Sequence, residues 1–136
     1  MLKILFEQYI AAGSSGDLTK LRGLANHKTS RIRKRVAENP NCSIEILYQL
    51  SRDDSSEVRI AAALNRSVSL EILEALCKDQ DPDVRFAIAS DNYAPCQILT
   101  FFSEDENPYV RNRAAKTIQR LAKNGKRMSL SPSFNK

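Results

Sequence analysis

Apolar residues recur along the chain at a fixed spacing of 26 residues. Each repeat has an aliphatic residue, an arginine directly after it, and an alanine four residues beyond that arginine. The aliphatic column is Ile32, Val58, Val84 and Val110, and the arginine column is Arg33, Arg59, Arg85 and Arg111. Upstream in the same frame, leucine stands at positions 21, 47, 73 and 99. A period without gaps indicates a repeat protein in which each repeat is one supersecondary unit.

Within one repeat the apolar residues have helical spacing. Ile46, Leu47 and Leu50 form one stripe, and a second stripe begins at Val58. Turn-forming and capping residues, such as those at 53–56, separate the two stripes, so each repeat is predicted to be two short helices. Because one such pair cannot bury its stripe alone, neighbours must stack. The sequence therefore predicts an all-α fold, a right-handed α-solenoid of about four two-helix repeats with a capping helix at each end.

The same frame predicts the ends of the domain. Shifted back once, it puts Phe6 and Ile10 on core columns, so Met1 to Ala12 is expected to be a lone second helix that caps the N-terminus, with a turn at 13–16. The last helix should run on through Leu121. We expect one domain over residues 1–123, with a cap at 1–16 and repeats at about 17–42, 43–68, 69–94 and 95–123, and then a disordered tail at 124–136.

These repeats resemble the leucine-rich repeat variant family, a short relative of the HEAT-type helical repeats. The shared features are the Leu-x-x-Leu helix, the Asp turn, Val-Arg, alanine, and an Asn-Pro or Asn-x loop. The resemblance covers Leu18 to about Leu121 and implies a helical-repeat architecture without implying one activity. The family is also associated with an iron–sulfur module ahead of its repeats. No cysteine cluster stands there in this sequence, so we do not expect the cluster.

Composition narrows the function only a little. The 136 residues carry a net charge of +5, which permits an acidic partner without requiring one. No apolar run approaches the roughly 20 residues that a membrane span needs, and the charged opening segment is a poor signal peptide. Cys42, Cys77 and Cys96 form no CxxC pair, which favours a reduced, cytoplasmic setting.

The repeated arginines allow two interpretations. They could form a basic ladder that faces an anionic ligand. Alternatively, they tie successive helix pairs together through the aspartates that precede an arginine by six residues, as the likeness to HEAT repeats implies; these are Asp53, Asp79 and Asp105. The structural interpretation is favoured because repeated identities usually serve stacking. His27, the single histidine, stands in the aspartate column of the first repeat, and we expect it to pack or to cap.

Positions that differ between repeats are better candidates for function. The variable columns of the second helices define a strip with Ile60, Leu64 and Phe86 in its middle and Lys34, Arg35, Arg113 and Lys116 at its ends. An apolar centre with a charged rim is typical of protein-binding surfaces. The alternative is that the three apolar residues are additional core. We hypothesise that the strip binds another protein.

Two other function classes have weaker support. Arg31, Arg33, Lys34 and Arg35 cluster as phosphate-binding residues would, and the last helix adds further cations, so nucleic-acid backbone binding is the alternative function. Aromatic residues for base stacking are nearly absent beside these cations, which favours ion-paired or solvated charge. We find no nucleophile–base pair, metal-ligand spacing or cofactor motif, and therefore expect no enzymatic activity, no metal and no cofactor. Ser129 and Ser131 in the tail could accept phosphate.

Overall fold

A computed structural model describes residues 1–125, and every regular element in that range is helical. The described range holds nine α-helices and one 3-10 helix, which confirms the all-α prediction. These helices fall into two compact units. Unit 1 runs from Met1 to Leu76, and unit 2 begins at Cys77.

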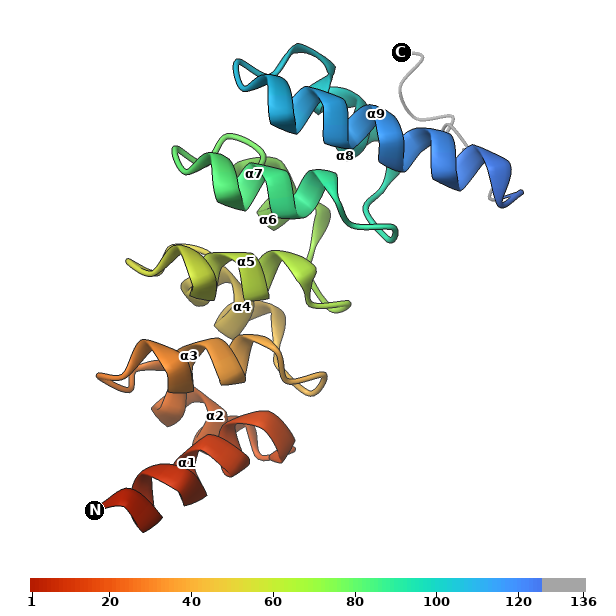
Figure 1. Ribbon diagram of the computed structural model, residues 1–136. Coiled ribbons are helices and arrows are strands. Elements are labelled where there is room, and N and C mark those ends of the chain that lie inside the picture. The colour runs from red at the N-terminus through yellow and green to blue at the C-terminus, as the bar shows by residue number, and fades with distance from the viewer. Residues whose placement is uncertain (126–136) are drawn as a thin grey trace. The chain divides into compact units, whose positions relative to one another are not determined.

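Unit 1 contains six helices, which are α1 (Leu2–Ser14), α2 (Leu18–Ala25), α3 (Ser30–Ala37), α4 (Ile44–Leu50), α5 (Ser56–Leu64) and α6 (Leu70–Leu76). Figure 1 shows α1, α3 and α5 side by side in this unit, and neighbours in that row are in contact. The short helix α2 packs on α3, and α4 packs on α5. We call α2, α4 and α6 first helices, and α1, α3 and α5 second helices.

The predicted columns form the core of unit 1. The aliphatic side chains of these columns are almost fully buried; they include Leu21, Ile32, Val36, Ile46, Leu47, Leu50 and Val58. Burying one such side chain contributes about 1.5–3 kcal/mol. The prediction that Phe6 and Ile10 of α1 occupy core positions is wrong. Their side chains are 64 % and 48 % exposed, because no helix of residues 1–125 covers them.

Polar side chains begin the first helices of unit 1. Asp17 Oδ1 accepts a hydrogen bond from the N–H of Thr19 at 2.9 Å, at the start of α2. Ser43 Oγ accepts one from the N–H of Ile46 at 3.3 Å, at the start of α4. Because the first turn of a helix leaves its amides without main-chain partners, these caps fix where each helix begins.

Asparagine side chains join neighbouring second helices. Asn39 Nδ2 donates to the carbonyl oxygens of Ala12 and Ser15 at 2.9 and 3.0 Å. Asn65, one repeat later, donates in the same way to the carbonyls of Ala37 and Asn39 at 2.7 and 2.9 Å. Both asparagines are buried, and these bonds give their amide groups the partners that burial requires.

Unit 2 contains α7 (Pro82–Ala89), α8 (Cys96–Phe101), the 3-10 helix η1 (Phe102–Glu104) and α9 (Pro108–Lys123). Helix α9 packs against α7, α8 and η1, and Figure 1 shows it beside α7. As predicted, α9 runs past Leu121, and with 16 residues it is longer than the second helices α1, α3 and α5. Thr117 Oγ1 on this extension donates to the carbonyl of Ala89 at 2.7 Å, which ties α9 to α7.

The ends of the helical region differ slightly from the prediction. Helix α1 ends at Ser14 rather than Ala12, because the N–H of Ser15 still bonds to the carbonyl of Ala11. At the other end, Asn124 bonds to the last turn of α9 and Gly125 takes a positive φ of 65°. The disordered tail was predicted at 124–136; Asn124 and Gly125 belong to the described range, and residues 126–136 lie outside it. A single domain over 1–123 stays a prediction.

Candidate functional site

The repeated arginines make two-pronged ion pairs inside each unit. In unit 1, Arg33 binds Asp53 from Nε to Oδ2 at 2.7 Å and from Nη2 to Oδ1 at 2.9 Å. In unit 2, Arg85 binds Asp105 in the same way, at 2.9 and 3.2 Å. Each aspartate follows its arginine by 20 residues and therefore belongs to the next helix pair. These ion pairs thus join successive helix pairs within a unit.

Each arginine also closes the turn ahead of its own helix. Its Nη1 donates to the carbonyl oxygen six residues earlier, in the pairs Arg33 to His27, Arg59 to Asp53, Arg85 to Asp79 and Arg111 to Asp105. Arg85 is only 6 % exposed. An anionic ligand cannot reach a guanidinium held in this way, so the geometry of Arg85 favours the structural interpretation.

His27 caps a turn. Its Nδ1 accepts a hydrogen bond from the main-chain N–H of Thr29 at 3.0 Å. In the next repeat Asp53 Oδ1 does the same with the N–H of Ser55 at 2.9 Å. His27 therefore caps its turn as Asp53 does in the next repeat. Unlike a carboxylate, the imidazole cannot form an ion pair with an arginine.

The ion pair controls the protonation of Asp53. Burial alone would raise the pKa of Asp53, but hydrogen bonds from Arg33 and from the N–H of Ser55, together with the charges of Arg33 and Arg59, outweigh it and hold that pKa below its usual value. The hydrogen bond to Asp53 raises the pKa of Arg33, and that to Asp105 raises the pKa of Arg85. The arginines therefore stay charged throughout the physiological pH range.

An open groove lies between α3 and α5 in unit 1, with a volume of about 450 Å³. We call it the α3–α5 groove; it is lined by Lys34, Glu38, Pro40, Glu57, Ile60, Ala61, Leu64, Asn65, Arg66 and Ser67. Leu64 is 41 % exposed and Ile60 is half-buried. Three residues of the predicted strip, Lys34, Ile60 and Leu64, therefore line one groove, whereas Arg35 is outside its lining.

The cations beside the α3–α5 groove have acidic partners. Lys34 Nζ lies 3.2 Å from Glu57 Oε2, and Arg35 Nη1 lies 3.3 Å from Glu38 Oε2. The sequence predicted that Lys34 and Arg35 form a basic end of the strip, but in the structure both side chains are ion-paired. Exposed pairs of this kind contribute little to stability, so charged groups of a partner can replace either member at small cost.

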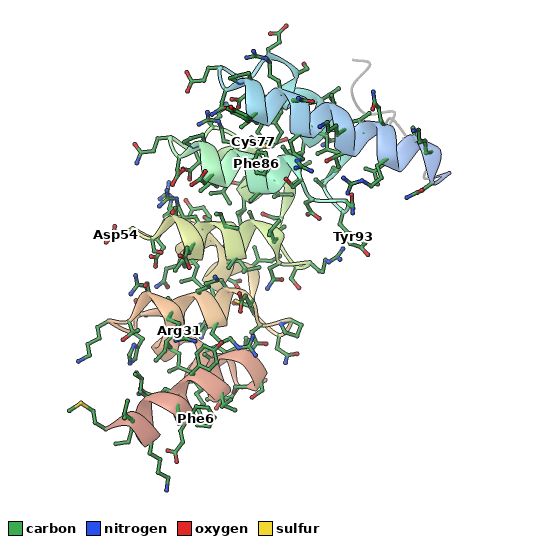
Figure 2. All side chains as sticks on the ribbon, in the orientation of Figure 1. Phe6, Arg31, Asp54, Cys77, Phe86 and Tyr93 are labelled. Carbon is green, nitrogen blue, oxygen red and sulfur yellow. The ribbon has the colours of Figure 1, made fainter. Side chains whose placement is uncertain are left out.

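Phe86 is neither freely exposed nor part of the core of unit 2. The residue is half-buried on α7, and the guanidinium carbon of Arg113 on α9 lies 5.1 Å from the centre of its ring. Figure 2 labels Phe86 on α7. Lys116 is exposed one turn after Arg113 on α9. The predicted rim residue Arg113 therefore lies over the ring of Phe86, whereas Lys116 is exposed.

The basic cluster of α3 is engaged inside unit 1. The guanidinium carbons of Arg31 and Arg35 lie 5.4 and 5.3 Å from the ring centre of Tyr9 on α1, and Figure 2 labels Arg31 on α3. Arg33 is held by Asp53, and Lys34 by an exposed glutamate. These contacts weaken the case for a phosphate-binding patch. The role of Tyr9 was not predicted, although Tyr9 stands 26 residues before Arg35 and therefore in the same repeat column.

The cysteines and the potential metal ligands of residues 1–125 are the candidates for chemistry. No three His, Cys, Asp or Glu side chains of this range gather as they would around a metal ion. Cys42 and Cys77 are buried, Cys96 is half-buried, and these three cysteines form no disulfide with one another. Burial raises the pKa of Cys42 to about 11, so this thiol stays protonated near neutral pH. None of the helices in this range has the length and apolar character needed to cross a membrane.

Comparison with known proteins finds no family model that matches the chain, and no match among curated proteins or solved structures. The likeness to the leucine-rich repeat variant family therefore stays a prediction.

Proposed function

We propose that the chain is a non-enzymatic α-solenoid that binds another protein through the variable face of its second helices. The observation that carries this proposal is the α3–α5 groove, in which Leu64 is 41 % exposed beside the half-buried Ile60. An exposed aliphatic side chain in a concave surface loses water when a partner covers it, which favours binding by about 25 cal/mol per Å² of apolar area. Single exposed leucines are common, but one set in a groove is a candidate anchor site.

The polar groups around the groove indicate the kind of partner. Lys34, Glu57 and Glu38 all line the groove and supply both signs of charge; Lys34 is paired with Glu57, and Glu38 with the neighbouring Arg35. A nucleic acid would meet the two carboxylates as well as the lysine, and its phosphates would be repelled. A protein segment with an apolar side chain flanked by mixed charges fits this surface better.

The solenoid itself is part of the proposal. Its support is the period of 26 residues, together with the Arg33–Asp53 and Arg85–Asp105 pairs, which join successive helix pairs inside each unit. Similar helix pairs that contact only their neighbours are the basis of solenoid folds. In this proposal Phe86, Arg113 and Lys116 form the variable face of the second helices within unit 2.

A matched pair of leucine variants tests the proposed site. Leu64 and Leu70 both belong to unit 1 and are both 41 % exposed, but only Leu64 lines the groove. Tagged chain captures partners from source extract with and without nuclease treatment, and mass spectrometry measures the amount bound. We expect Leu64→Ser to lower the captured partner by at least about fivefold, and Leu70→Ser to leave it unchanged.

Two results of that experiment would contradict the proposal. Equal loss of partner in both leucine variants would mean that the groove is not the binding surface. Captured material that disappears on nuclease treatment would move the function to nucleic-acid backbone binding, which must also weaken steeply with salt. Circular dichroism of both variants checks that each remains helical.

A further inference from the structure

The last two arginines of the repeated column differ in their exposure. Arg85 on α7 is only 6 % exposed, whereas Arg111 on α9 is exposed to solvent. The alanines four residues after these arginines differ in the same way, because Ala89 is fully buried and Ala115 is exposed. Unit 2 therefore covers this surface in one repeat and leaves it open in the next.

An open pocket of about 450 Å³ lies on this exposed surface of α9. We call it the Arg111 pocket; its lining includes Leu99, Ser103, Arg111, Ala114, Ala115 and Ile118. Among the described residues that line it, Arg111 is the single charged one. An apolar surface beside one cation fits a ligand that combines an aliphatic group with an anion.

The guanidinium of Arg111 is anchored as that of Arg85 is. Nη1 of Arg85 donates to the carbonyl oxygen of Asp79 at 2.6 Å. Nη1 of Arg111 donates in the same way to the carbonyl oxygen of Asp105, six residues before it. The turn ahead of α9 therefore orients this side chain before any ligand binds, which lowers the entropy that binding costs.

The other edge of the Arg111 guanidinium is open. In Arg85 this edge binds a carboxylate, since Nε and Nη2 both donate to Asp105 at 2.9 and 3.2 Å. Within residues 1–125, the side-chain hydrogen bonds of Arg111 both come from Nη1, so Nε and Nη2 face no protein acceptor there. The residue 20 positions after Arg111 is Ser131, outside the described range, and a serine side chain has no carboxylate.

We propose that the Arg111 pocket binds an acidic turn of another protein. A carboxylate of that turn accepts from Nε and Nη2 of Arg111, and the helix that follows the turn packs on Ala115. Unit 2 contains a contact of this form, in which the turn of Asp105 and the helix α9 behind it cover Arg85 and Ala89 of α7; Figure 1 shows α9 beside α7. Two parallel bonds from a guanidinium to a carboxylate add geometric selectivity to the charge. This site is separate from the α3–α5 groove.

Charge and shape favour an acidic protein segment over two other occupants. Asp53 and Asp105 already bind arginines within their own units, so a second copy of the chain would have to break one of these pairs to reach Arg111. A nucleic acid offers phosphates, but its backbone carries no aliphatic side chain to cover Ala115 and Ile118.

NMR spectroscopy of the isotope-labelled full chain with a synthetic peptide tests the proposal. The peptide copies residues 104–119, which contain the acidic turn and most of α9. We expect the Nε–H signal of Arg111 and the amide signal of Ala115 to shift as the peptide is added. A peptide with Asp105→Asn should bind at least about tenfold more weakly, because an amide cannot accept both bonds from the guanidinium.

Two variants of the chain separate the ion pair from general charge. Arg111→Lys keeps the charge but cannot form the two-pronged pair, and should weaken peptide binding at least about tenfold. Arg120→Lys, at an exposed residue of α9 outside the pocket lining, is the matched control and should leave binding unchanged. Circular dichroism checks that both variants are folded, and the Asp105→Asn peptide tests the same pair on the native chain.

Four results would overturn the proposal. The first is that neither signal shifts at peptide concentrations up to about 1 mM. The second is that the Asp105→Asn peptide binds as tightly as the original one, and the third is that Arg111→Lys and Arg120→Lys bind the peptide equally well. The fourth is self-association of the native chain in sedimentation velocity that Arg111→Lys abolishes, which would assign the pocket to a second copy.

Discussion

Replacing Asn65 by aspartate tests the polar tie between α3 and α5. Asn65 Nδ2 donates to the carbonyls of Ala37 and Asn39 at 2.7 and 2.9 Å, and its Oδ1 accepts from the N–H of Ser67 at 2.8 Å. Asn65→Asp keeps the shape and the acceptor. It removes both donors and sets a negative charge against two carbonyl oxygens, at a residue that is only 7 % exposed.

The expected loss of stability follows from those contacts. Each lost hydrogen bond contributes about 1 kcal/mol net, and leaving two buried carbonyls beside a poorly solvated carboxylate adds a comparable amount. We therefore expect the free energy of unfolding to fall by about 3–4 kcal/mol near pH 7. That is a large part of the roughly 5–15 kcal/mol that stabilises a typical domain.

The loss should depend on pH. Burial and the two carbonyl groups disfavour the charged form, so the pKa of the introduced carboxyl lies above its unfolded value of about 3.9. The folded state then binds the proton more tightly than the unfolded state does. The penalty is therefore complete above the raised folded pKa and becomes smaller as the pH falls toward about 4.

Urea unfolding followed by circular dichroism measures this at about pH 7 and about pH 4.5. Asn41→Asp, at an exposed residue two positions after Asn39, is the matched control and should change the free energy of unfolding by less than about 0.5 kcal/mol. If Asn65→Asp were as stable as the control, or lost the same free energy at both pH values, the buried donor role of Asn65 would be refuted.

Three further predictions concern other contacts. Asp53→Asn should lower the free energy of unfolding by about 2 kcal/mol near neutral pH. Because pairing with Arg33 lowers the pKa of Asp53, the difference from the native chain should shrink as the pH falls below about 4, which acid-unfolding curves measure. Phe86→Ala should lower the free energy of unfolding by about 2 kcal/mol in urea titrations, since a half-buried ring and its contact with Arg113 are lost; no change would mean that the ring is solvated. Cys42, whose pKa is raised to about 11, should react with a thiol reagent at least about a hundredfold more slowly in the native chain than in denaturant, and equal rates would contradict its burial.

The period of 26 residues predicted the helices and most of the core, because columns that repeat an aliphatic residue must serve the same contact in every repeat. The aliphatic residues Ile32, Val58, Val84 and Val110 are all at most 1 % exposed. The same reasoning failed for Phe6 and Ile10. A column predicts burial only where a neighbouring helix exists to cover it, and the sequence pattern alone does not supply that helix.

The candidate site was only partly predictable, because ion pairs between neighbouring helices depend on side-chain conformations that the sequence pattern does not show. Variation between repeats pointed to Ile60 and Leu64, which line the α3–α5 groove. It did not indicate that Glu57 would hold Lys34. The buried role of Asn39 and Asn65 was also not predicted, although their spacing of 26 residues, one repeat, is visible in the sequence.

Site-specific photo-crosslinking tests the central claim, that the α3–α5 groove binds a protein. A photo-reactive amino acid replaces either Leu64 in the groove or Leu70 outside it, two positions with the same exposed fraction of 41 %. The chain is irradiated in nuclease-treated source extract, and cross-linked species are separated by mass and identified. The proposal predicts a discrete protein adduct from position 64 and none from position 70. Adducts from position 70 alone, or the same adducts from both positions, would contradict it.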